Sequence, residues 1–326
     1  MQQQIAERVQ ERQALITEVR REISRVIVGQ HALVDRLLIG ILSRGHILLE
    51  GVPGLAKTTA VKTLAATIRA SFQRIQFTPD LLPADILGTE VYEPKTGEFR
   101  VRKGPIFHNI ILADEVNRAP SKVQSALLEA MQEKQVSLGG ETFPLEEPFF
   151  VLATQNPIEQ EGTYPLPEAQ VDRFMLKIQV GYPSAEEEAE IVSRLHREEY
   201  LPSPRGVLEK EDLRALQDLV RQIHVDPRVL EYVVALVQAS RNLESRLPDL
   251  ARYVQYGASP RGSIYLVAAA KAAAFLECRS YVTPQDIKKV GEDVLRHRIL
   301  LSYEGEAEQI TSSQIIQALF DVVEVP

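Results

Sequence analysis

The sequence predicts an α/β protein in which a five-stranded parallel sheet lies between helices in a three-layer core, followed by an all-helical domain. A glycine-rich loop at residues 50–59 joins an apolar, strand-like run to a stretch with helical periodicity. Short apolar runs then alternate with helical patterns as far as residue 180. Beyond Tyr182-Pro183 strand-like runs nearly vanish. We therefore expect an α/β domain over residues 1–182 and a helical domain over residues 183–326.

The composition is that of an ordinary globular protein. The 326 residues exceed one typical core, and 44% of them are hydrophobic and 25% charged. The net charge of −8 argues against a nucleic-acid binder, which usually presents a basic surface. Cys278 is the single cysteine and is expected to be a small buried hydrophobe. With no apolar signal core and no run long enough to span a membrane, the expected location is the cytoplasm.

Two helices are expected before the loop. Residues 2–25 place apolar side chains at mostly helical spacing, and residues 31–43 resume the pattern. The break between them contains Val28 and Gly29. An apolar turn just before a nucleotide-binding strand can pack on an adenine ring, and ordinary core packing is the alternative.

The loop has the context of a phosphate-binding loop, because a strand at 46–49 precedes it and a helix at 58–69 follows it. It reads Glu50-Gly51-Val52-Pro53-Gly54-Leu55-Ala56-Lys57-Thr58-Thr59. Its backbone N–H groups and the helix N-terminus form an anion site. Lys57 is expected to reach the β- and γ-phosphates, and the Thr58 hydroxyl to ligate Mg²⁺. Ala56 stands where the consensus has glycine, and a plain glycine-rich turn is the alternative.

Polar side chains end two later strands. The run at 109–113 leads into Asp114 and Glu115, and the run at 148–154 leads into Asn156. Beside a phosphate loop, Asp114 is expected to hold Mg²⁺, Glu115 to take the proton of an attacking water, and Asn156 to align that water. A solvated acidic strand end is the alternative for the two acids.

The remaining elements complete the order of the two domains. Strands are expected at 71–77 and 174–180, with a hairpin around residues 91–101 and a second near 135–146. The second hairpin is available for gripping a partner, or is an ordinary connector. In the helical domain, Arg261 lies in the first turn of a helix, where a cation opposes the helix dipole. A bound anion explains it, and a solvated arginine head is the alternative.

This order of motifs resembles that of the AAA+ ATPases, and the residues within the motifs are similar to those of the MoxR family. The matching stretches are residues 51–58, 104–107, 112–120, 124–133, 153–157, 162–174 and 259–262. The resemblance covers nearly the whole chain, except about the first two dozen residues and the last segments of the helical domain. Alanine before the loop lysine is usual in this family.

The resemblance implies a role for each matched residue. Lys57 and Thr58 are the Walker A residues of an ATP-binding loop, Asp114 and Glu115 are Walker B with Glu115 as catalytic base, and Asn156 is sensor one. Arg173 matches the arginine finger, which acts on the nucleotide of the neighbouring subunit. Arg261 matches sensor two, from the lid of the same subunit, and the hairpin near Gly139-Gly140 matches the helix-two insert of this clade.

The function implied is Mg²⁺-dependent hydrolysis of ATP to ADP and phosphate in a ring, expected to be a hexamer. The clients implied are other proteins, often those with von Willebrand A-type domains, in complex maturation or metal-cofactor insertion. Two alternatives remain open at this point. One is a nucleic-acid motor or loader, against which the acidic balance argues, and the other is a scaffold that uses ATP only to assemble.

Overall fold

The computed structural model describes residues 2–51, 57–156, 163–196 and 203–326. Its centre is a five-stranded sheet in the order β2-β5-β8-β1-β9, with all neighbouring strands parallel. The strands are β1 (Ile47–Glu50), β2 (Phe72–Gln76), β5 (Ile110–Asp114), β8 (Phe150–Gln155) and β9 (Leu176–Gln179). The predicted five-stranded parallel sheet is therefore confirmed.

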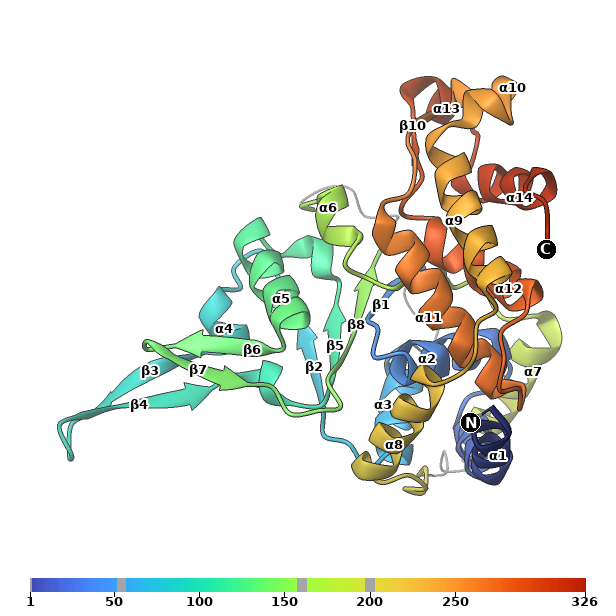
Figure 1. Ribbon diagram of the computed structural model, residues 1–326. Coiled ribbons are helices and arrows are strands. Elements are labelled where there is room, and N and C mark those ends of the chain that lie inside the picture. The colour runs from blue at the N-terminus through green and yellow to red at the C-terminus, as the bar shows by residue number, and fades with distance from the viewer. Residues whose placement is uncertain (1, 52–56, 157–162, 197–202) are drawn as a thin grey trace.

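Helices cover both faces of the sheet (Figure 1). One layer contains α1 (Gln2–Val26), α2 (His31–Leu42) and α3 (Lys57–Thr67), and the other contains α4 (Pro83–Leu87) and α5 (Ser121–Glu133). The alternation of side chains along β1 shows the two cores. Ile47 and Leu49 join the cluster with α2 and α3, whereas Leu48 joins the cluster with α4 and α5. Burial on both faces explains why these strands are continuous apolar runs.

Two antiparallel hairpins extend from the same side of the core (Figure 1). They are β3 (Gly88–Glu93) with β4 (Glu98–Lys103), and β6 (Gln135–Leu138) with β7 (Glu141–Pro144). The helix α4 is the second helix after the loop, and β3–β4 follows it directly. The order of elements thus makes β3–β4 the insert at helix two, and the expected assignment of the 135–146 hairpin to that insert is wrong.

Short elements connect the strands, and helices dominate the second domain. The connections include η1 (Pro105–Phe107), η2 (Val116–Arg118) and α6 (Glu168–Val171). The second domain contains α7 (Ala185–His196), α8 (Lys210–Arg221), α9 (Pro227–Arg241), η3 (Leu243–Ser245), α10 (Pro248–Ala251), α11 (Pro260–Leu276), α12 (Pro284–Leu295), α13 (Tyr303–Ala307) and α14 (Ser312–Val322). One small pair departs from the all-helical expectation, because β10 (Val254–Tyr256) pairs antiparallel with β11 (Leu300–Leu301).

Caps and turns explain where the helices of this domain begin and end. Asp226 accepts a hydrogen bond from the Arg228 backbone N–H, and Thr283 forms a capping box with Asp286. Cys278 follows α11 with φ 57° and packs, partly buried, against the hydrophobic cluster, where the sequence predicts a small buried hydrophobe. None of the helices in the described part of the chain combines the length and apolar character needed to cross a bilayer.

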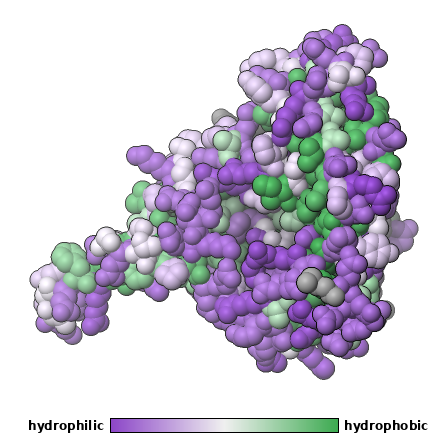
Figure 2. Space-filling model, in the orientation of Figure 1, coloured by the Kyte–Doolittle hydropathy of each residue, from purple (hydrophilic) through white to green (hydrophobic). Residues whose placement is uncertain are grey.

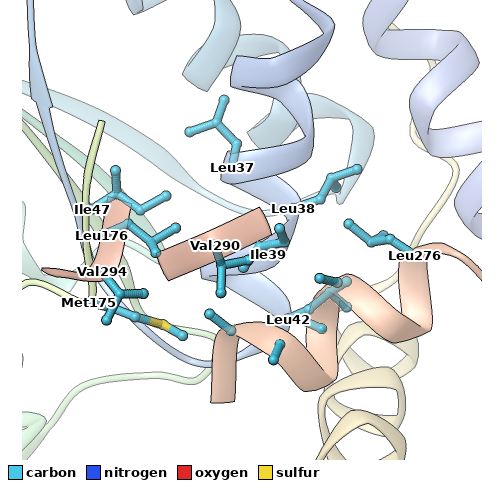
Figure 3. Packing of buried hydrophobic residues seen from close by; sticks show 14 of the residues in the cluster. Leu37, Leu38, Ile39, Leu42, Ile47, Met175, Leu176, Leu276, Val290 and Val294 are labelled. Atoms are coloured by element: carbon cyan, nitrogen blue, oxygen red, sulfur yellow. The ribbon is translucent and has the colours of Figure 1, made fainter. Parts of the chain in front are cut away.

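The helical domain packs directly against the α2 layer of the core. Figure 3 shows Leu38 and Leu42 of α2 between Leu276 of α11 and Val290 of α12. On its other side α2 lies close against the sheet, since a Cβ added at Gly40 would lie 2.6 Å from the Ile47 side chain of β1. The two domains thus share one hydrophobic cluster, and this shared packing holds the helical domain against α2.

Candidate active site

The carboxyl edge of the sheet gathers most of the predicted site residues. β1 ends at Glu50 and continues into Gly51, and Lys57 begins α3. On neighbouring strands β5 ends at Asp114, and Asn156 follows β8. Parallel strands all end at the same edge, so these side chains converge there, which is where open α/β sheets bind their ligands.

Lys57 is a half-buried cation facing carboxylates. Its ammonium donates a hydrogen bond to the carbonyl of Gly51. Burial lowers the pKa of Lys57, while the negative charges of Asp114, Glu115 and Glu50 act to raise it. A cation at the first residue of a helix also adds to the positive end of the helix dipole. This combination of charges attracts an anion such as a phosphate group.

Asp114 has a donor at each carboxylate oxygen. The Arg74 guanidinium donates to Oδ2 through Nε at 2.9 Å and Nη2 at 2.6 Å. The Thr154 hydroxyl donates to Oδ1 at 2.6 Å. Arg74 therefore engages the carboxylate that the sequence predicts for a metal ion.

Glu115 has an unusual backbone and several partners. Its φ of 56° and ψ of 51° are left-handed, a conformation that costs a non-glycine residue about 1–2 kcal/mol. The Thr154 hydroxyl accepts a hydrogen bond from its N–H at 2.8 Å. Its Oε2 accepts from Gln76 Nε2 at 2.8 Å and lies 3.2 Å from Arg118 Nε. Backbone strain of this kind is concentrated at functional sites. Here the strained residue directs its carboxylate toward Gln76 at the end of β2.

The structure describes only some of the other residues that are predicted to bind the phosphates or the attacking water. Thr58 and Thr59 lie half-buried in the first turn of α3, and Asn156 is 7% exposed. Five predicted loop residues lie outside the described residues, namely Val52, Pro53, Gly54, Leu55 and Ala56.

A cavity of about 440 Å³ lies where β9 ends and α2 begins. Apolar side chains line it, including Leu33 of α2, Ile178 of β9 and Val180 directly after β9. The backbone ties it to the loop, because Val180 N–H donates to the Glu50 carbonyl at 2.9 Å. A partly apolar cavity next to the predicted phosphate site is of the kind that holds a nucleobase.

The residues that line this cavity differ from those that the sequence predicts at an adenine ring. Gln30 and the first residues of α2 line it, whereas Val28 and Gly29 lie just before that wall. Gly29 instead supports the turn, since its φ is +61° and a Cβ there would lie 1.9 Å from Glu187 Oε1. The cavity is therefore lined by residues 30–33 and not by residues 28–29, which the sequence predicted to pack on an adenine ring.

A second cavity, of about 250 Å³, lies at the amino edge of the sheet. Arg173 and Arg261 both line it, together with Arg44, His46 and Lys134. Arg173 precedes β9, and Arg261 in the first turn of α11 lies 3.4 Å from an Asp172 carboxylate oxygen. The first helical turn around Arg261 is thus occupied by an ion pair within the chain.

The two cavities lie at opposite ends of β1. His46 before the strand lines the second cavity, and Gly51 after it belongs to the phosphate loop. Four residues of strand span about 13 Å. The structure therefore groups Arg173 with Arg261 and separates both from Lys57. This placement does not support the expected action of Arg261 on the nucleotide of its own subunit.

The donor set at the carboxyl edge fits a magnesium ion held together with a nucleotide. Among the described residues, no group of three or more His, Cys, Asp or Glu could cage a metal ion. Magnesium usually takes only one or two protein carboxylates and completes its shell with phosphate oxygens and water. The Asp114 carboxylate and Thr58 hydroxyl are hard oxygen donors of this kind.

The sequence did not point to two groups of residues that contact the candidate site residues. Arg74 and Gln76 alternate along β2, so both side chains lie on the face that meets Asp114 and Glu115. This i, i+2 spacing at the end of a predicted strand was a usable signal. Arg298, which follows α12 and contacts the segment around Arg173, had no signal in the sequence pattern.

Comparison with known proteins places these features in a family. A family model described as "ATPase family associated with various cellular activities (AAA)" matches residues 46–176, and a model of the AAA lid domain matches residues 249–319. The solved structure of a proposed ATPase from Cytophaga hutchinsonii superimposes with a TM-score of 0.93 at 51% identity, covering 98% of this chain and 97% of that one.

Curated relatives cover most of the chain. Chaperone MoxR1 of Mycobacterium tuberculosis is 51% identical over 94% of this chain and 81% of its own length. Protein MoxR of Methylorubrum extorquens is 34% identical over 94% of both chains. With the phosphate-loop edge and the helical lid described above, these matches show that the chain belongs to the MoxR family of AAA+ ATPases.

Proposed function

We propose that the carboxyl edge hydrolyses ATP with Mg²⁺, and that its residues have the roles their chemistry suits. Lys57 neutralises the terminal phosphates, and Thr58 with Asp114 holds the metal ion, which supplies charge stabilisation. Glu115 takes the proton of the attacking water, and Asn156 positions that water. The observation that carries this proposal is the convergence of Lys57 and the two acids at one sheet edge.

We also propose that hydrolysis requires a ring, expected to be a hexamer. Arg173 and Arg261 lie at the edge opposite to Lys57, so within one chain neither lines the proposed ATP site. We infer that both act on the nucleotide of a neighbouring subunit, where an arginine finger contributes a rate factor of about 10³ to 10⁵. This extends to Arg261 the trans role that the sequence predicted for Arg173 alone.

The proposed clients are other proteins, with von Willebrand A-type domains as the leading class. Support comes from a 51% identical relative named as a chaperone. The β3–β4 hairpin projects from the core and has apolar surface along its length (Figure 2). The rings of Tyr92 and Phe99 contact each other there in a tilted arrangement, 5.3 Å between centroids, and these residues are 52% and 68% exposed. Exposed aromatics on a projecting arm are suited to protein contact. A cytoplasmic location stays a prediction.

The first test compares Glu115→Gln with the wild type. We expect the variant to bind ATP and to lose at least about 100-fold of kcat, because it lacks the base. Glu211→Gln on the exposed surface of α8 is the matched control. Hydrolysis by Glu115→Gln at the wild-type rate contradicts the assignment of the base.

A second measurement addresses assembly and clients. We expect the specific activity of the wild type to rise with protein concentration as rings form. Zero turnover in assembled rings favours the scaffold, and stimulation by DNA at physiological salt favours the nucleic-acid motor. Immobilised Glu115→Gln with ATP is expected to retain a client protein that it releases with ADP, and to retain less of it when Tyr92 and Phe99 are also changed to Ala.

A further inference from the structure

The lid holds the main chain of the segment that carries Arg173. Four consecutive backbone carbonyls, from Asp172 to Met175, each accept a hydrogen bond from a lid side chain. These bonds run from Arg298 Nη2 to Asp172 O at 2.8 Å, from Tyr265 Oη to Arg173 O at 3.3 Å, from Arg298 Nη2 to Phe174 O at 2.7 Å, from His297 Nε2 to Phe174 O at 3.0 Å, and from Arg298 Nη1 to Met175 O at 3.4 Å. A helix-to-strand connection is thus fixed from outside its own domain.

The Asp172 side chain forms the second half of this attachment. Arg298 Nε lies 2.8 Å from its Oδ1, and the Ser259 hydroxyl donates to the same carboxylate at 3.0–3.1 Å. Arg261 lies 3.4 Å away. The Arg298 side chain is 1% exposed, and its guanidinium stacks on the Tyr265 ring at 5.0 Å. A fully buried guanidinium requires such partners, because an unpaired buried charge is strongly destabilising.

The Arg173 side chain itself has less support. Its Nε is buried and has no hydrogen-bond partner among the described residues. Its guanidinium is therefore placed chiefly through its main chain, which the lid holds. Positions of catalytic groups matter at the scale of about 1 Å, where an error can cost about 100-fold in rate.

We propose that Tyr265, His297 and Arg298, together with Asp172, are positioning residues that set Arg173 for the neighbouring subunit's nucleotide. Since these lid residues lie on α11 and directly after α12, any movement of the lid moves Arg173 with it. The orientation of one subunit's lid thereby controls hydrolysis in the next subunit. This inference rests on the proposed trans role of Arg173.

The test uses Tyr265→Phe and Arg298→Lys. Tyr265→Phe removes one hydroxyl and keeps the ring under Arg298, so its fold is expected to be intact. Arg298→Lys keeps the charge and loses the forked donors. We expect Tyr265→Phe to lose about 3- to 10-fold of kcat and Arg298→Lys about 10- to 100-fold, with the dissociation constant for ATP unchanged within twofold.

Mixed rings distinguish positioning from a structural role. Each variant is mixed with Glu115→Gln, which lacks the base and keeps its own Arg173, and mixing is verified by native mass spectrometry. We expect activity above that of either protein alone, because a Glu115→Gln neighbour serves the variant's intact site. The maximum is expected near equal amounts for a variant that loses about 10-fold or more of kcat, and at about three parts variant to one part Glu115→Gln for one that loses about threefold. No gain on mixing overturns the inference for that residue, since a defect in the variant's own site cannot be relieved by a neighbour.

Two controls separate this inference from the proposed function. Arg173→Ala must show the same gain on mixing with Glu115→Gln, and its failure to do so contradicts the trans role itself. Arg279→Lys disturbs another charge pair of the lid, in which Arg279 Nη1 donates to the buried Asp286 at 2.7 Å. We expect it to keep wild-type kcat, and a loss equal to that of Arg298→Lys overturns the inference by showing a general effect of lid stability.

Discussion

Arg74 and Asp114 form a two-pronged ion pair at the carboxyl edge of the sheet, with Nε and Nη2 of the arginine both on Oδ2. Asp114 is also the proposed magnesium ligand, so the arginine and the metal ion compete for one carboxylate. We expect Arg74→Gln to lower the Mg²⁺ concentration at half-maximal ATP binding by about 1.4- to 5-fold, the equivalent of a partly exposed ion pair of 0.2–1 kcal/mol.

This prediction is checked by titrating Mg²⁺ against fluorescent ATP bound to Arg74→Gln. The matched control is Arg102→Gln, which removes the same charge from an exposed position on β4. A higher Mg²⁺ requirement in Arg74→Gln contradicts the competition, because it indicates that the arginine prepares Asp114 for the metal ion.

The hydrogen bond from Gln76 to Glu115 holds the proposed base. This bond occupies one oxygen of the Glu115 carboxylate and draws it toward β2. We expect Gln76→Ala to raise kcat by about threefold in assembled rings, on the scale of a partly exposed hydrogen bond. Steady-state hydrolysis at saturating Mg²⁺ and ATP measures this. Gln73→Ala on the same strand is the control, and a decrease of kcat in Gln76→Ala alone shows that Gln76 aligns the base productively.

The sequence predicted the sheet and its carboxyl-edge residues well because these features are local. Each strand is an apolar run, and Lys57, Asp114 and Asn156 each follow such a run or begin the next helix. Parallel strands then bring their ends together without further information. The caps at Asp226 and Thr283 are local in the same sense.

The features that the sequence did not predict depend on how distant segments pack. Arg261 lies in the first turn of a helix, which the sequence shows. Which edge of the sheet it faces depends on how the lid packs against α2. The lid contacts of Asp172 join residues more than 80 positions apart, as in the bond from Ser259. The cavity at the end of β9 is lined from Gln30 onward and not by Val28 and Gly29, since the left-handed turn at Gly29 and Gln30 leads directly into α2.

Gly29 is required for the turn before α2 by two separate constraints. Its φ is +61°, and a Cβ would lie 1.9 Å from Glu187 Oε1. Gly97 at the tip of β3–β4 has φ +74° and nothing within 4 Å of such a Cβ. We expect Gly97→Ala to cost about 1 kcal/mol in the free energy of unfolding and Gly29→Ala clearly more, with weaker ATP binding. Denaturant titration and ATP titration of both variants measure the difference, and equal effects show that Glu187 moves aside freely.

The burial of His46 leads us to expect that the folded protein loses stability in mild acid. The residue is buried, its Nδ1 accepts from the Val151 N–H at 3.0 Å, and burial lowers its pKa from 6.5 to about 4. His46 therefore binds a proton below about pH 6.5 in the unfolded chain, but only below about pH 4 in the folded chain. Stability falls as the pH decreases through this window, by about 2 kcal/mol at pH 5 from His46 alone. We expect His46→Asn to be less stable than the wild type at pH 7 but to lose less between pH 7 and pH 5 in denaturant titrations. The control His31→Asn, at an exposed position, should keep the wild-type slope, and an unchanged slope in His46→Asn excludes this histidine as the cause.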